Sequence, residues 1–235
     1  MKGRVLIVAG SDSGGGAGIQ ADIKTVTALG GFAMTAITAL TAQNTQGVHD
    51  IHGVPEDFIT RQIEVVLSDL GADALKTGML HSPAVIETVV KALETCDAPL
   101  VVDPVMRAKG GAALLLPEAQ AALVELLLPR ATLLTPNVPE AEALTGMSIQ
   151  SMADLQAVGE RPMTLGPKAV LMKGGHLDSA AMTDVLVTDE GASIIGLGRI
   201  RRNTPHTHGT GCTLASAVAA GLAQQLTLHR SVEQI

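Results

Sequence analysis

The sequence predicts a three-layer α/β protein, in which helices cover both faces of a mostly parallel sheet and an antiparallel hairpin closes one edge. Several short runs are apolar at every position, which is typical of strands buried on both faces of a sheet. Helical patterns separate these runs, and this alternation favours parallel strands joined by helices. The chain has 235 residues, 46% of them hydrophobic, so residues 1–235 are expected to form a single domain.

Four continuous apolar runs supply the predicted central strands, at residues 4–10, 99–102, 132–134 and 169–172. Another strand is expected to end at Gln43. Near the end of the chain, residues 184–188 and 193–197 flank an Asp-Glu-Gly sequence that is suited to a hairpin turn. This pair predicts the antiparallel edge.

The predicted helices lie between these strands. Apolar residues recur at helical spacing near residues 19–26 and 59–70. Further helices are expected over residues 83–95, 117–128, 139–144, 152–165 and 214–226. Residues 231–235 resemble the opening of another helix, and we expect the natural protein to continue beyond them.

Composition and charge exclude several classes of function. The net charge of −7, without a basic stripe, argues against broad nucleic-acid binding. No apolar run is long enough to span a membrane. Cys96 and Cys212 are far apart and offer neither a disulfide framework nor metal-ligand spacing, which favours a cytoplasmic protein. Because Trp and Tyr are absent, a bound heterocycle would lie mainly on aliphatic, Met or peptide surfaces.

The segment 207–213, Thr-His-Gly-Thr-Gly-Cys-Thr, predicts an anion site at the start of the last long helix. Gly209 and Gly211 allow a turn in which several backbone N–H groups point at one spot, together with those of Thr210 and Cys212. The helix dipole favours negative charge there, and a cysteine so placed tends to have a lowered pKa. The alternative is a glycine turn before a core helix, with an inert buried cysteine.

Polar or glycine-rich segments follow the carboxyl ends of the predicted strands, at residues 11–16, 43–44, 103–104, 136–137 and 173–176. In open parallel sheets this edge forms the ligand crevice, so these segments should converge with the 209–213 turn. The first glycine loop fails both common nucleotide motifs. A dinucleotide fingerprint needs glycine where Ile19 stands, and a phosphate loop needs lysine where Gly16 stands. The loop is either a flexible lip over the crevice or a tight turn from strand to helix.

Asp103, Asn137 and Glu140 offer the oxygen ligands that Mg²⁺ accepts, usually together with water and nucleotide phosphates. Asn137 and Glu140 are also spaced as a capping box, and spacing alone favours that interpretation. Lys173 follows a buried strand beside glycines, where its charge suits a phosphate.

Gln43 carries an amide that offers both a donor and an acceptor to a ring with paired nitrogen groups. Asp22 should lie at the same corner, with an exposed helical carboxylate as the alternative. Met79 and Met106 would supply flexible apolar walls, although methionine is more often core filling.

Six segments, at residues 10–22, 41–45, 103–106, 135–140, 173–176 and 207–213, occur in an order that closely resembles the hydroxymethylpyrimidine and phosphomethylpyrimidine kinases of thiamine biosynthesis, in the ribokinase-like superfamily. The resemblance runs from Leu6 to Leu222. It implies transfer of the ATP γ-phosphoryl to 4-amino-5-hydroxymethyl-2-methylpyrimidine, then a second transfer to the monophosphate, by a homodimer.

The resemblance also implies roles for single residues. Those around the pyrimidine would be Gln43, Asp22, Gly10, Met79 and Met106. The Mg²⁺-ATP side would consist of Asp103, Asn137, Glu140, Lys173 and Thr210, with Asp103 and Glu140 towards the metal. The catalytic anion hole would be formed by Gly209, Thr210, Gly211 and Cys212. Most members of the wider superfamily have an aspartate base at position 212.

A cysteine at 212 suggests a hypothesis about the two transfers. The second acceptor is a phosphate oxygen that needs no base and that an aspartate would repel, whereas a neutral thiol would not. Two alternatives to the pyrimidine kinase remain open. The nearest is a pyridoxal or pyridoxine kinase, whose acceptor is a similar hydroxymethyl-bearing ring. The other is a non-catalytic pyrimidine- or nucleotide-binding domain.

Overall fold

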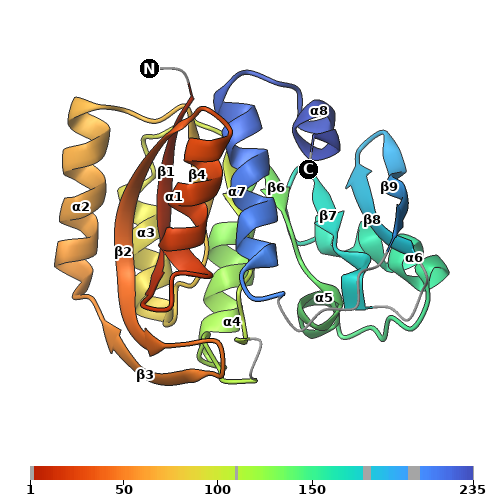
Figure 1. Ribbon diagram of the computed structural model, residues 1–235, viewed down its shortest axis with the longest axis horizontal. Coiled ribbons are helices and arrows are strands. Elements are labelled where there is room, and N and C mark those ends of the chain that lie inside the picture. Colours follow the sequence, from red (N-terminus) through yellow and green to blue (C-terminus); the bar gives the residue numbers. More distant parts are fainter. Residues whose placement is uncertain (1–2, 109–110, 177–180, 201–206, 235) are drawn as a thin grey trace.

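The computed structural model describes residues 3–108, 111–176, 181–200 and 207–234. Its strands form one sheet in the order β3-β2-β1-β4-β5-β6-β7-β8-β9 (Figure 1). The strands are β1 (Arg4–Asp12), β2 (Phe32–Gln43), β3 (Val48–Gly53), β4 (Ala74–Thr77), β5 (Leu100–Val102), β6 (Leu133–Leu134), β7 (Val170–Met172), β8 (Ala181–Thr188) and β9 (Gly191–Ile200). All four predicted central strands are confirmed, as β1, β5, β6 and β7, and Gln43 does end a strand.

The sheet is parallel from β2 to β7 and antiparallel at both edges. The predicted hairpin is confirmed as β8 and β9, which pair from Thr188 and Gly191 outwards. The antiparallel strand β3 at the opposite edge was not predicted. Its sequence, Val-His-Asp-Ile-His-Gly, is half polar and largely exposed, so it lacks the apolar run that marks the central strands.

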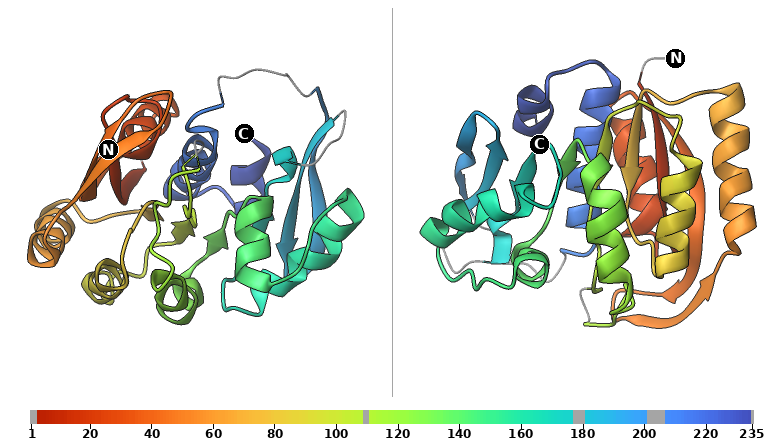
Figure 2. Two further views of the ribbon diagram at one scale, coloured as in Figure 1. Left: turned by 90° about the horizontal axis from the view of Figure 1, so that it is seen from below. Right: turned by 180° about the vertical axis from the view of Figure 1, so that it is seen from behind.

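Helices cover both faces of the sheet, as the two views of Figure 2 show. One face carries α2 (Glu56–Asp69), α3 (Pro83–Ala92), α4 (Ala119–Ala122), α5 (Val138–Thr145) and α6 (Met152–Met163), and the other α1 (Gly18–Ala28), α7 (Thr210–Ala223) and α8 (Leu228–Glu233). Alternate residues of β1 divide between the two apolar cores. Leu6 and Val8 belong to the core under α2 and α3, whereas Val5 and Ile7 belong to the core under α1 and α7.

One predicted helix differs in form. The segment expected as a helix over 117–128 consists of α4, a π-helical turn η1 (Leu123–Leu127) and a 3₁₀ turn η2 (Leu128–Arg130). Pro129 in η2 has no backbone N–H to continue a regular α-helix. Leu123, Leu127 and Leu128 all remain buried in the core.

The topology gathers the ends of the parallel strands at one edge. The segments that follow β1, β4, β5, β6 and β7 leave the sheet there, and α7 begins close to them (Figure 1). In the parts of the chain that the structure describes, no helix combines the length and the apolar character needed to cross a membrane.

Candidate active site

The N-terminus of α7 is the centre of the site. Gly209 precedes the helix with a left-handed φ of 81°, and within the described residues no side chain caps this end. A Cβ at Gly209 would overlap the carbonyl oxygen of Gly16, so glycine is required where the two turns meet. Among the described residues the N–H groups of Gly211 and Cys212 therefore remain available to an anion, while that of Thr210 makes a long hydrogen bond of 3.4 Å to the Thr207 carbonyl. The predicted convergence of the first glycine loop with the 209–213 turn is confirmed by the contact between Gly16 and Gly209.

Cys212 lies in the first turn of α7, and its side chain is half-buried. Burial raises the pKa of its thiol to about 11, and the nearby Lys76 ammonium and the backbone N–H of Gly18 lower it only in part. The lowered pKa expected from the position at a helix N-terminus is therefore wrong. The thiol is neutral at physiological pH.

Lys173 joins the anion site to two carboxylates. Its Nζ lies 3.0 Å from Asp103 Oδ1 and 3.9 Å from Glu140 Oε2. A Cβ at Gly211 would lie 3.3 Å from Lys173 Nζ and 3.8 Å from Asp103 Oδ2, which places this group directly beside the first turn of α7. Burial alone would lower the pKa of Lys173, but the attraction of Asp103 and Glu140 raises it, so the lysine keeps its charge.

Asn137 and Glu140 form the capping box that their spacing predicts. The Asn137 side chain accepts from the Glu140 N–H at 2.9 Å, and Glu140 Oε2 accepts from the Asn137 N–H at 2.8 Å. The same carboxylate faces Lys173, so capping does not exclude a place in the site. Burial raises the pKa of Glu140 to about 7 despite the attraction of Lys173.

Asp22 lies beneath the site and not on its surface. Both of its oxygens accept from Lys76 Nζ, at 3.0 and 2.8 Å, and Oδ1 also accepts from Ser216 Oγ at 2.7 Å. Asp22 and Lys76 are both completely buried. The alternative of an exposed helical carboxylate is wrong, and a ligand in the crevice would meet Asp22 only if the ion pair opened.

Lys76 is a residue that the sequence analysis missed. It lies on β4. Its partner Asp22 also binds Ser216, which is one helical turn after Cys212 in α7, so the Lys76–Asp22 pair lies one turn below Cys212. Burial would lower the pKa of Lys76, but the attraction of Asp22, Cys212 and Asp103 together raises it. A lysine directly after Ala74 and Leu75 was the available clue, since a fully buried lysine needs a partner.

The pyrimidine side of the predicted site is partly assembled. A Cβ at Gly10 would lie 3.0 Å from Met79 Sδ, so these two residues are in contact. Met79 is buried with Ala39 and Leu114, and its carbonyl accepts from Thr38 Oγ1 at 2.7 Å. Met106 instead packs against the core under α2 and α3.

Gln43 is held at the end of β2 by the first glycine loop. Ser13 Oγ donates to the Gln43 carbonyl at 2.8 Å and accepts from the Gln43 N–H at 2.8 Å. The Gln43 side chain extends towards His208, with Gln43 Nε2 at 3.4 Å from His208 Nε2. This contact joins the predicted pyrimidine side to the turn that begins α7.

Asp12 organises the loop and was also missed. Its carboxylate accepts from the N–H groups of Gly14 at 2.7 Å, Gly16 at 3.1 Å and Ala17 at 2.8 Å, and lies 2.8 Å from His208 Nε2. Burial raises the pKa of Asp12, but the hydrogen bonds from His208 and the backbone together have the larger effect, so the pKa is lowered. The loop is thus the tight turn from strand to helix, and an aspartate before glycines was the clue.

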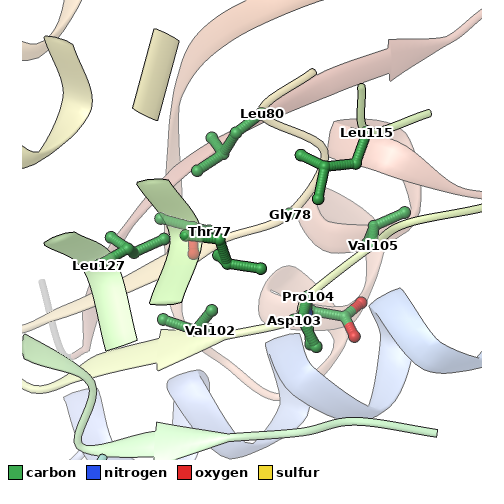
Figure 3. Close-up of a pocket in the computed structure, with 10 residues that line it drawn as sticks. Thr77, Gly78, Leu80, Val102, Asp103, Pro104, Val105, Leu115 and Leu127 are labelled. Carbon is green, nitrogen blue, oxygen red and sulfur yellow. The ribbon is translucent and has the colours of Figure 1, made fainter. Parts of the chain in front are cut away.

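A small cavity lies beside Asp103 and is lined by residues from β4, β5 and η1, among them Thr77 and Val102 (Figure 3). Its volume of about 10 Å³ is that of about one water molecule. Thr77 lines it, and the buried Oγ1 of Thr77 has no hydrogen-bond partner among the described residues. The cavity is too small to hold a heterocycle or a nucleotide.

Comparison with known proteins identifies the family. A sequence model described as phosphomethylpyrimidine kinase matches residues 12–234, nearly the whole chain. The chain belongs to the phosphomethylpyrimidine kinase family. A hydroxymethylpyrimidine/phosphomethylpyrimidine kinase of Bacillus subtilis is 48% identical over 232 residues, which cover 98% of this chain and 85% of the relative.

Solved structures support the family and the fold. A crystal structure of phosphomethylpyrimidine kinase from Clostridium difficile 630 is similar with a TM-score of 0.87 and 44% identity, over 99% of this chain and 96% of that one. Pyridoxal kinase from Staphylococcus aureus in complex with pyridoxal has a TM-score of 0.88 and 35% identity, over 99% and 84%. The family is one of kinases, and the fold is the ribokinase-like α/β fold that the sequence predicts.

Proposed function

We propose that this kinase transfers the γ-phosphoryl of ATP to the hydroxymethyl group of 4-amino-5-hydroxymethyl-2-methylpyrimidine, and then a second phosphoryl to the monophosphate, in thiamine diphosphate biosynthesis. The observation that carries the proposal is the uncapped N-terminus of α7 beside Lys173 and Asp103. Phosphoryl transfer depends mostly on positioning and on stabilising negative charge. Backbone N–H groups and a charged lysine converge here for that purpose.

The ATP side would consist of Lys173, Asp103, Asn137, Glu140 and Thr210. Lys173 would contact the phosphates, with Gly209, Thr210 and Gly211 supplying the N–H groups of the anion hole. The described residues contain no cluster of three or more His, Cys, Asp or Glu side chains suited to a metal. Mg²⁺ in such enzymes is usually held by one or two carboxylates together with nucleotide phosphates.

Asp103 and Glu140 fit this manner of holding Mg²⁺. Thr135 and Lys173 both contact Asp103 Oδ1, and Asp103 Oδ2 is the oxygen nearer the first turn of α7. When bound, Mg²⁺ would neutralise charge on the phosphates. Lys173 already pairs with both carboxylates, so the lysine would orient them and share the neutralisation.

The acceptor side would be formed by Gln43, Gly10 and Met79, with Met106 at its border. Asp22 would act through Lys76, which it holds beneath Cys212. In a loose transition state the acceptor oxygen forms its bond to phosphorus late, so a strong base at position 212 is not required for transfer. The neutral thiol of Cys212 would then repel neither acceptor: neither the hydroxymethyl group in the first step nor the phosphate dianion in the second.

We further infer that residues 1–235 act as one kinase domain in the cytoplasm and that the enzyme is a homodimer. Large apolar side chains on the β2–α2 side support an interface, since Leu40 is 47% and Phe58 58% exposed. Sedimentation velocity at micromolar concentration would test the dimer. A monomer at these concentrations would contradict it.

A pyridoxal kinase is the second candidate, because the chain is similar to pyridoxal kinases over nearly its whole length. The deciding experiment measures Mg²⁺-ATP-dependent transfer to the pyrimidine, its monophosphate and pyridoxal in parallel, with products resolved by mass. Sequential mono- and diphosphate formation from the pyrimidine would confirm the proposal. Transfer to pyridoxal alone would favour the second candidate, and no transfer would favour a non-catalytic binding domain.

A further inference from the structure

The side chain of Gln43 projects from a fixed backbone. Its N–H and carbonyl both hydrogen-bond Ser13 Oγ at 2.8 Å, so the first glycine loop holds the residue from two directions. The position of the amide group is therefore largely decided by Thr41 on one side and His208 on the other. What remains to be decided is which end of the amide faces which neighbour.

Thr41 selects the amide nitrogen as its neighbour. Thr41 Oγ1 lies 2.9 Å from the carbonyl oxygen of Ser11 and 3.1 Å from the Gln43 amide atom assigned as Oε1. A hydroxyl has a single hydrogen to donate, and the shorter contact to the Ser11 carbonyl can only use that hydrogen. Thr41 must then accept from Gln43, which an NH₂ group can satisfy and a carbonyl oxygen cannot.

His208 selects the amide oxygen. Its Nε2 lies 2.8 Å from the Asp12 carboxylate, which can only accept, so this nitrogen carries a hydrogen. The same nitrogen is 3.4 Å from the Gln43 amide atom assigned as Nε2, so the hydrogen bonds of both neighbours require the oxygen and nitrogen assignments of this amide to be exchanged. An N–H group facing NH₂ would leave two donors opposed, whereas a carbonyl oxygen would share the hydrogen with Asp12. The oxygen and nitrogen of an amide are distinguished by their hydrogen-bond network, and here both neighbours agree.

We propose that His208 is a specificity-determining positioning residue, which turns the Gln43 amide oxygen towards itself and the amide nitrogen towards Thr41. The outer edge of the amide then presents one acceptor and one donor in a fixed order. An aminopyrimidine edge, with a ring nitrogen acceptor beside an exocyclic NH₂ donor, matches this pair. The inference deepens the proposed function and depends on it for the identity of the acceptor.

The order of the two groups matters for discrimination. A pyridine ring that carries a hydroxyl does not offer the adjacent ring nitrogen and amino group, so it gains less from a fixed donor–acceptor pair. Polar sites reject an analogue that leaves their buried groups unpaired. If His208 lost its N–H, the amide could rotate and the preference for the pyrimidine would fall.

Two substitutions of His208 with side chains of similar length test the contribution of its N–H group alone. His208→Gln keeps an N–H at the end of the side chain, and His208→Met removes it, while both remove the ring. We expect His208→Met to raise KM for the pyrimidine about tenfold, the effect of one lost hydrogen bond. The kcat values for the pyrimidine and for pyridoxal should each change less than about threefold. His208→Gln should keep KM within about threefold of the wild type. Thr41→Val should raise KM in the same direction as His208→Met.

A merely structural role would give a different pattern, because His208 adjoins Gly209 and the anion hole. Equal losses in His208→Gln and His208→Met, or a fall in kcat shared by all acceptors, would overturn the proposal. Retained pyrimidine preference in His208→Met would overturn it as well.

The orientation can be measured without any turnover. In the wild-type protein, nuclear Overhauser contacts from the Gln43 NH₂ protons should reach the Thr41 methyl group and not the His208 ring proton Hε1. Contacts to Hε1 instead would overturn the proposal. If the wild-type enzyme phosphorylated no pyrimidine while the Thr41 contacts were present, the proposed function would fall and the amide orientation would stand.

Discussion

Replacing Gly209 with alanine tests whether the contact between the two glycine turns shapes the anion site. A Cβ at 209 would overlap the Gly16 carbonyl oxygen and lie 2.7 Å from its carbonyl carbon. Because carbon atoms pack at roughly 3.5–4.0 Å, the carbon contact alone would separate the turns by about 1 Å, and the overlap with the oxygen requires at least as much. A displacement of about 1 Å can cost about 100-fold in rate, so we expect kcat of Gly209→Ala to fall about 100-fold.

Gly146→Ala is the matched control. Gly146 ends α5 with a left-handed φ of 71°, but a Cβ there would meet nothing within 4 Å. The backbone strain alone should cost about 1–2 kcal/mol and lower Tm by about 2–8 °C, with kcat unchanged. Thermal unfolding and steady-state kinetics would be measured on both variants. The steric argument would be refuted if Gly209→Ala kept more than a tenth of the wild-type kcat. It would also be refuted if kcat of Gly146→Ala fell as far as kcat of Gly209→Ala.

Three further predictions concern charge. Cys212→Asp should slow the second transfer at least tenfold more than the first, because an aspartate repels the dianionic acceptor; single-turnover assays with each acceptor would measure both. Asp73→Asn should lower the free energy of unfolding by about 1 kcal/mol at pH 7, measured by urea unfolding. Arg4 lowers the pKa of Asp73 from 3.8 to about 2, which corresponds to about 2 kcal/mol. The Asp73 side chain is 32% exposed, so solvent screening reduces this value. Lys76→Met should destabilise the protein by about 3–5 kcal/mol, because it leaves Asp22 buried and unpaired.

Each of these predictions has its own control. Cys212→Ser keeps a neutral group and should slow both transfers alike, and equal slowing in Cys212→Asp would remove the charge argument. The Asp73 pKa is lowered, so its contribution is complete above about pH 4 and is lost as the pH falls to about 2. Glu64→Gln, in an exposed pair 3.8 Å long, should change stability little at any pH. The double variant Lys76→Met/Asp22→Leu should lose less than the single variants together, and strict additivity would contradict the pair.

Local patterns in the sequence were sufficient for most of the fold. Short runs that are apolar at every position and are separated by helical patterns favour strands buried on both faces, so β1, β5, β6 and β7 were predictable. The capping box at Asn137 and the glycine turn before α7 were predictable for the same reason, since each depends on neighbours within a few residues. Convergence of the loops then followed from the parallel sheet.

The missed features depend on partners far apart in the chain. β4 was not predicted, because Lys76 interrupts its apolar run, and the partner that neutralises this lysine is 54 residues away. Asp12 and His208 are 196 residues apart, so no local pattern links the first glycine loop to the turn before α7. Buried polar pairs of this kind are specified by tertiary structure, which a single sequence does not display.

The protonation state of Cys212 depends on two opposing effects on the pKa of its thiol: the helix N-terminus lowers the pKa, and burial raises it. A helix N-terminus stabilises a thiolate by about 0.3–1 kcal/mol, or about 2 kcal/mol in favourable buried geometry, which lowers a pKa by about 1.5 at most. Complete burial can raise a pKa by up to about 3–5, and partial burial by less. At Cys212 burial dominates even with Lys76 nearby, and the pKa of the thiol is about 11. In the proposed function the helix dipole would then act on the transferred phosphoryl and not on the cysteine, so the same site would receive a neutral acceptor first and a charged one afterwards.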